Sequence, residues 1–453
     1  MSVAATYPPG PRTPRTLQTV AALTRQRPHL ERLRRRYGNL FSVEIHAIGT
    51  MVIVADPALV KQVFTASPTV LHAGTGSPLG TVLGRHSLLA TDEEYHLEQR
   101  KLLLPPFHGK RMQAYEQLIA DFAADEIDRW PEGTEFATIG SFMTITLRAI
   151  LGAVFGAAGE DLDVLERVIP PYVESGSRMA TLRGLQKDLG PRSPWGRFLA
   201  HRAAVDARLD ILIERARGDA ALAERSDVLA LLVQATHTDG SPMTSAEIRD
   251  QLVTLLAAGH ETTAGTLAWA VERLRRHPDL AARLTAEVDA GGRALRDATI
   301  RELQRSRPVI SFAGRLTREE YELGGYRLPS GTRIGLAAGL THYDPDLFPE
   351  PDRFLPERFL TAKPDTYSWI PFGGGIRRCI GAAFAHMEMD VVLRTLLERV
   401  ELVGDASAPD ERWAFRGVAH VPAEGGRVTI RRRPASAANG ADPATAAALA
   451  LAG

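Results

Sequence analysis

A stretch of helical periodicity from Thr244 to His277 sets the scale of the fold. Thr244-Ser245-Ala246-Glu247 has the form of a capping box, apolar residues then recur at helical spacing, and Pro278 ends the run. Roughly 33 residues with a rise of 1.5 Å each make a helix of about 50 Å, which is long enough to cross a whole molecule. We therefore expect a large, mainly helical domain built around this element.

The middle of this helix breaks its own pattern. It consists of Ala258-Gly259-His260-Glu261-Thr262-Thr263, and Gly259 alone costs about 1 kcal/mol relative to alanine at such a position. One interpretation is a polar patch whose threonine hydroxyls bond back to helix carbonyls. The other is a functional site, because local rules are broken mainly where function requires it.

Cys379 is the only cysteine among 453 residues, and it lies in the glycine-rich stretch Ser368–Gly381. A helix is predicted to begin at Gly381, and the positive end of its dipole favours a thiolate. A thiolate is a metal ligand that can hold a haem iron from one side. The alternative is a small buried hydrophobic residue. A phosphate loop does not fit, since the third glycine of that motif would fall at Arg378 and no lysine follows.

The residues around Cys379 spell F-x-x-G-x-R-x-C-x-G, from Phe372 to Gly381. Here the chain resembles the cytochrome P450 family. The resemblance implies a mainly α fold with small β-sheets, one large α+β domain, and haem b (iron protoporphyrin IX) between the long central helix and the cysteine-bearing loop. It implies that Cys379 is the proximal iron ligand. The other cofactor-binding residues that it implies in this stretch are Phe372, Gly373, Arg377, which meets a propionate, and Gly381.

The centre of the long helix resembles the family's A-G-x-[ED]-T-T motif. The resemblance implies that the helix loosens at Gly259, beside Ala258, and opens a groove for dioxygen. Thr262 then holds the bound oxygen and its water, and Glu261 brings protons from solvent. His260 occupies the variable position, and we expect a helix-face histidine there rather than a metal ligand.

Further cations match the family's pattern. His96 and Arg100 share one helix face as H-x-x-x-R, and with Arg315 they are expected to meet the haem propionates, because a buried anion needs paired donors. Glu302 and Arg305 resemble E-x-x-R, whose buried cluster Arg358 completes. To these three residues we assign a structural role.

The substrate pocket is less defined by sequence. Residues 70–90 read as a long loop and residues 308–317 as a strand beside the pocket. The expected substrate contacts are Leu79, Val82, Val309, Ile310 and Phe312.

Composition limits the partners. Lys+Arg and Asp+Glu are both 54, which argues against a nucleic-acid binder, and one cysteine excludes an iron–sulfur site in this chain. Electrons are therefore expected from a separate ferredoxin- or flavodoxin-type protein, for which Lys101, Lys110 and Arg378 offer positive charge.

The N-terminus has no apolar span, so we expect no membrane anchor and a cytoplasmic protein, and we expect a monomer. Residues 1–15 are predicted to be an extended proline-rich segment, residues 16–433 the domain, and residues 434–453 a disordered alanine-rich tail.

The function implied by the resemblance is that of a haem-thiolate monooxygenase. It would insert one oxygen atom from O2 into a lipophilic small molecule, by hydroxylation or epoxidation. Two alternatives stay open: a haem-thiolate peroxygenase or isomerase, and a haem-based binding or sensor protein without turnover.

Overall fold

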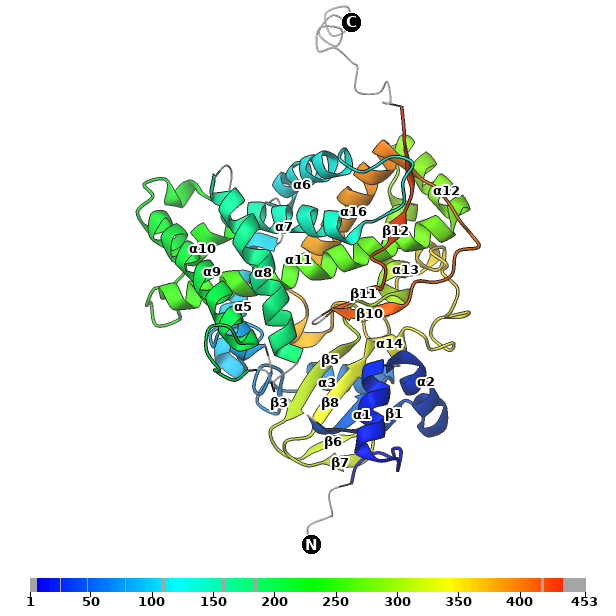
Figure 1. The fold of residues 1–453 in the computed structure, drawn as a ribbon. Helices are drawn as coiled ribbons and strands as arrows, with labels where there is room; N and C mark the ends of the chain where they lie inside the picture. Colours follow the sequence, from blue (N-terminus) through cyan, green and yellow to red (C-terminus); the bar gives the residue numbers. More distant parts are fainter. Residues whose placement is uncertain are drawn as a thin grey trace, which may run out of the picture.

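The long helix is α11 (Ser245–Arg276), and it crosses the middle of the helical part of the molecule (Figure 1). The capping box is formed as predicted: the backbone N–H of Glu247 donates to Thr244 Oγ1 over 3.2 Å, and the Glu247 carboxylate accepts from the Thr244 N–H over 2.8 Å. The computed structural model describes residues 6–24, 26–46, 48–77, 79–107, 111–156, 160–181, 184, 186–416 and 419–434.

Helices surround α11 on most sides. Both α7 (Ile139–Phe155) and α16 (Ala382–Arg399) pack against it. The other described α-helices are α1 Arg15–Thr24, α2 Gln26–Tyr37, α3 Pro57–Thr65, α4 Gly80–Leu83, α5 Glu93–Leu103, α6 Arg111–Ile127, α8 Glu160–Thr181, α9 Pro194–Arg217, α10 Val228–Gln234, α12 Pro278–Asp289, α13 Ala294–Ser306, α14 Ala338–Thr341 and α15 Arg358–Thr361.

A five-stranded sheet lies to one side of the helices, next to α1 and α2 (Figure 1). Its order is β1-β2-β8-β5-β3, where only the β2–β8 pair is parallel. Its strands are β1 Leu40–Ile45, β2 Gly49–Val54, β8 Arg333–Ala337, β5 Phe312–Thr317 and β3 Leu71–His72. The two-stranded pairs join β10 Trp413–Arg416 to β11 Ala419–Pro422, β12 Arg427–Val428 to β4 Phe136–Ala137, β13 Ile430–Arg432 to β9 Val400–Leu402, and β6 Tyr321–Leu323 to β7 Tyr326–Leu328.

The apolar core is divided in the same way. One large cluster surrounds α11, with Trp269 fully buried, and two small clusters lie against the sheet. The first small cluster includes Val52 and Val54, and the second includes Phe41 and Ile53. Since successive residues of a strand point to opposite faces of the sheet, β2 contributes side chains to both small clusters.

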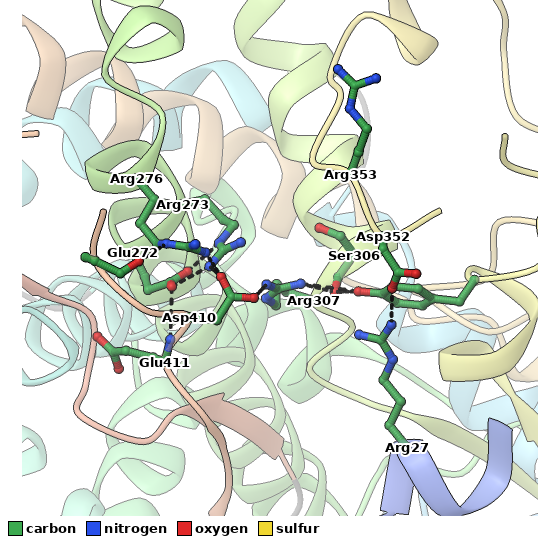
Figure 2. Close-up of polar contacts among 12 residues, drawn as sticks. Arg27, Glu272, Arg273, Arg276, Ser306, Arg307, Asp352, Arg353, Asp410 and Glu411 are labelled. Carbon is green, nitrogen blue, oxygen red and sulfur yellow. Dashed lines mark hydrogen bonds and ion pairs between the residues drawn. The ribbon is translucent and has the colours of Figure 1, made fainter. Parts of the chain in front are cut away.

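A network of ions fixes the segment that leads into β10. Asp410 lies between Arg273 and Arg276 of α11 on one side and Arg307 on the other (Figure 2). The next residue, Glu411, accepts hydrogen bonds from three backbone N–H groups between Glu424 and Arg427. Both ends of the β10–β11 hairpin are therefore tied down, which matters because the hairpin reaches the candidate site.

Several predicted elements differ from the structure. Residues 70–90 are not one loop, because they contain β3 and the short helix α4. The strand predicted from residue 308 begins only at Phe312. In the N-terminal segment, the carbonyl of Pro9 accepts a hydrogen bond from the Ser42 N–H over 3.0 Å, and α1 already begins at Arg15. Of the predicted C-terminal tail, residues 435–453 lie outside the described residues. Among the helices described, none combines the length and the apolar character that crossing a membrane requires.

Candidate active site

Cys379 lies between the 3-10 helix η4 (Gly375–Arg377) and α16. Its N–H donates to the carbonyl of Phe372 over 3.0 Å, and the N–H of Gly381 bonds to its sulfur. The side chain has accessible surface, but it lies deep among protein atoms, and this desolvation raises the pKa of the thiol. The Gly381 N–H and the charges of Arg100 and Arg378 pull the pKa down without overcoming burial. A stable thiolate here therefore needs more positive charge, which a bound metal ion supplies.

Two members of the glycine triplet before Cys379 have a task that the sequence did not indicate. Gly373 and Gly375 both have positive φ, at 64° and 62°. A Cβ on Gly374 would lie 2.5 Å from the ring of Phe64, and one on Gly375 would lie 2.0 Å from the Phe64 carbonyl oxygen. These two glycines make room for α3, and only Gly373 faces open space.

Four of the predicted cations converge near the cysteine loop. His96 and Arg100 come from α5, Arg315 from β5 and Arg377 from η4. The pKa of His96 is influenced by all three arginines, and that of Arg100 by Cys379. The sequence therefore identified a set of residues that the fold brings together.

One carboxylate faces these cations. Asp92, the N-cap residue of α5, forms an ion pair with Arg377, which also donates to the carbonyl of Leu88 over 3.2 Å. Burial opposes the ionisation of Asp92, but hydrogen bonds from Ala73, Thr75 and Gly74 hold its pKa below the usual range. Sequence reasoning missed Asp92, although an aspartate directly before a helix that begins Glu-Glu is a recognisable cap signal.

The positively charged side chains in this region outnumber the single carboxylate that faces them. Arg315 is buried, and burial together with Arg377 lowers its pKa to about 10. Burial and the neighbouring arginines lower the pKa of His96 to about 3, and its Nδ1 has no hydrogen-bond partner among the described residues. Buried cations are stable only when paired, so this region fits a ligand that carries carboxylates. The two propionates of haem meet that requirement.

The polar centre of α11 presents one face to accessible space. Ala258 is exposed and Thr262 is partly exposed, in a helix that is otherwise mostly buried. Thr262 Oγ1 donates to the Ala258 carbonyl over 2.9 Å, which is the back-bonding expected of a mid-helix threonine. The helix is continuous through Gly259, and the loosening expected there stays a prediction. Gly259 is small because Ile150 of α7 packs on it, 3.2 Å from where a Cβ would lie.

Glu261 points away from this face. It is buried, accepts a hydrogen bond from Ser177 Oγ of α8 over 3.3 Å, and lies 3.8 Å from Arg416 Nε of β10. Burial raises the pKa of its carboxyl group, although Arg416 opposes this. Nothing in the sequence near Glu261 indicated Arg416, because only the β10–β11 hairpin brings the two together. His260 is buried as well, rather than lying on an outer helix face.

The helix after the cysteine reaches the same region. Glu388 of α16 is fully buried beside Thr263 of α11, and burial raises its pKa well above the usual range. The loop that carries Cys379 and the centre of α11 are thereby joined through α16.

The predicted structural ion cluster lies apart from these residues. Arg305 and Glu302 are fully buried and doubly hydrogen-bonded over 2.7 and 2.8 Å, and Arg358 Nε lies 3.2 Å from Glu302. The guanidinium of Arg305 also donates to the carbonyl of His342, which fixes α13 against the chain after α14.

The predicted substrate contacts separate in the structure. Val82 and Leu79 pack in the helical core, where the Val82 carbonyl accepts from Tyr172 of α8. Val309 lies near Gly265 of α11, and Ile310 is partly buried just before β5. Phe312 packs against the small cluster around Phe41, on the sheet. Strand alternation turns its side chain toward that cluster, and a substrate contact at Phe312 stays a prediction.

Comparison with known proteins gives a consistent result. The family model described as "Cytochrome P450" matches residues 8–412. The chain is 50% identical over 428 residues to "Putative cytochrome P450 138" of Mycobacterium tuberculosis, covering 94% of this chain and 96% of the relative. It is 41% identical over 432 residues to "Putative cytochrome P450 135B1" of the same species, covering 94% and 91%. The solved structure of retinoic acid-bound cyanobacterial CYP120A1 has a TM-score of 0.82 at 22% identity, covering 95% of this chain and all of that one.

Proposed function

The chain belongs to the cytochrome P450 family of haem monooxygenases, and we propose that it oxidises a lipophilic small molecule with electrons from a ferredoxin- or flavodoxin-type protein. The comparisons confirm three predictions from the sequence, namely the family, the mainly α fold and haem b as the cofactor. The observation that carries the proposal is the group of three arginines beside the single cysteine, Arg100, Arg315 and Arg377, which exceed the one carboxylate facing them.

These residues would hold the haem from two directions. The Cys379 sulfur would bind the iron, and iron would keep it ionised against the effect of burial. His96, Arg100, Arg315 and Arg377 would bind the propionates. When bound, haem supplies the activation of dioxygen and the transfer of one oxygen atom to the substrate.

The face of α11 that carries Ala258 and Thr262 would bind dioxygen, and Glu261 would supply its protons. Since the Thr262 hydroxyl donates its proton to the Ala258 carbonyl, its lone pairs are free to accept a hydrogen bond. Glu261 is the nearest acidic group in sequence, and burial raises its pKa, which makes its carboxyl group a better proton carrier than an exposed glutamate. We assign Thr262 to orienting, and Glu261 to proton supply.

A lipophilic substrate suits the surfaces that reach this face. Ala258 is apolar and exposed, and Val309 packs on α11 about two turns farther along the helix, at Gly265. An apolar group placed there would bury surface without leaving polar atoms unpaired.

A separate electron donor follows from the single cysteine and from surface charge. Lys101 and Arg378 are exposed, and both adjoin residues of the cysteine region in sequence. Lys110, the third predicted contact, lies outside the described residues. An acidic donor is the partner that such charges favour.

The test is the absorption of the reduced holoprotein with carbon monoxide. We expect the red-shifted Soret band of thiolate-ligated haem, its loss in Cys379→Ser, and reduced haem content in Arg315→Gln. Arg353→Gln, which removes an exposed arginine, is the control and should retain both. A histidine-type band in the parent protein would contradict the assignment of Cys379.

The same holoprotein then separates the alternative functions. A panel of lipophilic compounds is screened for spin-state shifts, and compounds that bind are incubated with a surrogate ferredoxin system. Product formed with the donor supports the proposal. Product formed only with added hydrogen peroxide indicates a peroxygenase, conversion without any oxidant indicates an isomerase, and spectral shifts without product indicate a sensor.

A further inference from the structure

A cavity of about 250 Å³ lies on the side of α11 next to Glu261. Its titratable lining consists of His260 and Glu261 of α11, Glu166 and Glu174 of α8, and Arg416 of β10, and Thr144 of α7 adds a hydroxyl group. Apolar residues of α7 and α8 complete the wall. The space is far larger than one water molecule needs, and it offers several polar partners, which are the two conditions for internal water.

His260 is a residue of this cavity to which the proposed reaction assigns no role. Its side chain is 4% exposed, and its Nδ1 is inaccessible to solvent and has no hydrogen-bond partner among the described residues. Its backbone carbonyl is held by Thr146 Oγ1 of α7 over 3.0 Å, so the ring cannot simply turn outward with the helix. A buried polar atom left without a partner costs stability, and in native proteins it calls for an explanation.

The order of side chains around α11 connects His260 with the oxygen-facing side. Each residue advances by about 100° around a helix. Viewed along the axis, the sequence around the surface is therefore His260, Glu261, Ala258 and Thr262. Glu261 stands between the cavity and the face that carries Thr262.

Glu261 is held loosely enough to reach both sides. Its hydrogen bond with Ser177 is 3.3 Å long, and its ion pair with Arg416 spans 3.8 Å. Neither distance is that of a short charge-assisted contact, which lies near 2.8 Å. The two other carboxylates are engaged more closely: Glu166 by Arg148 over 2.7 Å, and Glu174 by Arg178 over 2.6 Å.

Burial shifts the pKa values of the two α11 groups in opposite directions. Burial and the charge of Arg416 lower the pKa of His260 to about 4, and burial raises that of Glu261 above its usual value of 4.5. The groups that face His260 across the cavity are Glu166 and Glu174 from α8 and Arg416 from β10; α7 contributes no titratable group to the lining. Burial therefore favours a proton on Glu261 over one on His260, which is the direction of transfer that a relay toward Glu261 requires.

We propose that His260 is a proton-relay residue that acts through Glu261: the His260 ring takes protons from water in this cavity and passes them to the Glu261 carboxylate. This proposal rests on the proposed function. In each turnover the redox partner supplies two electrons, and two protons from solvent convert the second oxygen atom of O2 to water. His260 gains and loses one proton per transfer and undergoes no net change.

The first test measures the ring itself and does not depend on turnover. The reduced carbon monoxide complex of the holoprotein is labelled with 15N-histidine, and its ring shifts are followed between pH 4.5 and 8. His260→Gln assigns the signal. We expect the shifts of His260 to move when Glu261 is changed to Gln, while those of His342, which is buried and bonded to the Arg305 carbonyl, stay constant. A His260 signal that ignores Glu261→Gln would overturn the proposal.

The second test compares His260→Asp with His260→Asn. These variants are matched in size, and only the first can carry a proton. Oxygen consumption driven by a surrogate ferredoxin system is measured in H2O and D2O across pH. We expect the Asn variant to be slowed about tenfold, with a larger solvent isotope effect and an altered pH profile, and the Asp variant to recover much of the rate. Equal rates for the two variants would refute the relay.

The two tests distinguish a failure of the His260 relay from a failure of the proposed monooxygenase function. If the parent protein lacks the thiolate–carbon monoxide band, the proposed function fails. If the band is present in parent and variants but the rates and ring shifts are unchanged, only the relay fails. If neither substituted protein retains haem, the histidine signals of the parent and of Glu261→Gln still decide.

Discussion

The buried cluster of Glu302, Arg305 and Arg358 allows a quantitative prediction. Glu302→Gln removes the one negative charge shared by two arginines while nearly conserving the shape of the side chain. With an amide nitrogen in place of Oε2, the substitution removes the 2.7 Å hydrogen bond from Arg305 Nε and the 3.2 Å contact with Arg358 Nε, and it leaves both arginines without a compensating negative charge. The amide oxygen can keep the 2.8 Å bond from Arg305 Nη2. The backbone N–H of Leu355 can still bond to the amide oxygen, since it donates to Oε1 over 2.8 Å.

The expected cost follows from burial. Arg305 and Glu302 have no exposed side-chain surface, and breaking such a pair costs about 3–5 kcal/mol because a charge is left unpaired in the interior. Proteins of 453 residues unfold with an entropy near 0.9 kcal/mol/K, on the basis of about 2 cal/mol/K per residue. The thermal midpoint should therefore fall by about 3–5 °C.

The assay is thermal unfolding of the holoprotein, followed by circular dichroism, with Arg353→Gln as the control. Arg353 pairs with Glu350, both side chains are more than half exposed, and the Arg353 side chain points away from the neighbouring ion network (Figure 2). This exposed pair contributes about 0–1 kcal/mol, so the control should shift the midpoint by about 1 °C at most. A Glu302→Gln midpoint no lower than that of the control would refute the reasoning.

Three further predictions concern the site. Gly375→Ala should lower the thermal midpoint more than Gly373→Ala: both force alanine into positive φ, at about 1–2 kcal/mol, but only the first pushes against Phe64. Similar midpoints would contradict the packing role. Thr262→Ala should reduce product per reductant consumed about tenfold, measured with a compound from the spin-shift screen, and an unchanged ratio would exclude its role. Burial opposes ionisation of Glu247, but its hydrogen-bond partners at the cap of α11 lower its pKa to about 2. The stability that this ionised carboxylate contributes is therefore present above pH 4.5 and should be lost as the pH falls toward 2. Urea unfolding midpoints of the parent protein should show this loss, and those of Glu247→Gln should not.

The sequence predicted elements whose signals are local. The capping box, the apolar period and the proline at position 278 act within a few residues of one another, and α11 ends within one residue of its predicted bounds. The cysteine motif is equally compact, and it led to the family and the cofactor. The strand expected from residue 308 begins later and the loop of residues 70–90 contains helix α4, because such short elements depend on the neighbours they pair with.

The candidate site shows the same division. His96, Arg100, Arg315 and Arg377 were identified from sequence as cations for one ligand, but their convergence around Asp92 depends on contacts between segments far apart in the chain. The glycine triplet was assigned to the cofactor, whereas two of its members serve Phe64.

The sequence by itself therefore determined the family and its haem cofactor, the long central helix with its polar centre, and the single cysteine and the cations that are proposed to hold that cofactor. Only the tertiary structure decided which groups are buried, which charges remain unmatched, and that His260 and Glu261 share a cavity beneath Arg416. The physical reason is range. Helix capping and periodicity act between residues close in sequence, whereas desolvation and charge pairing depend on every segment that folds around a group.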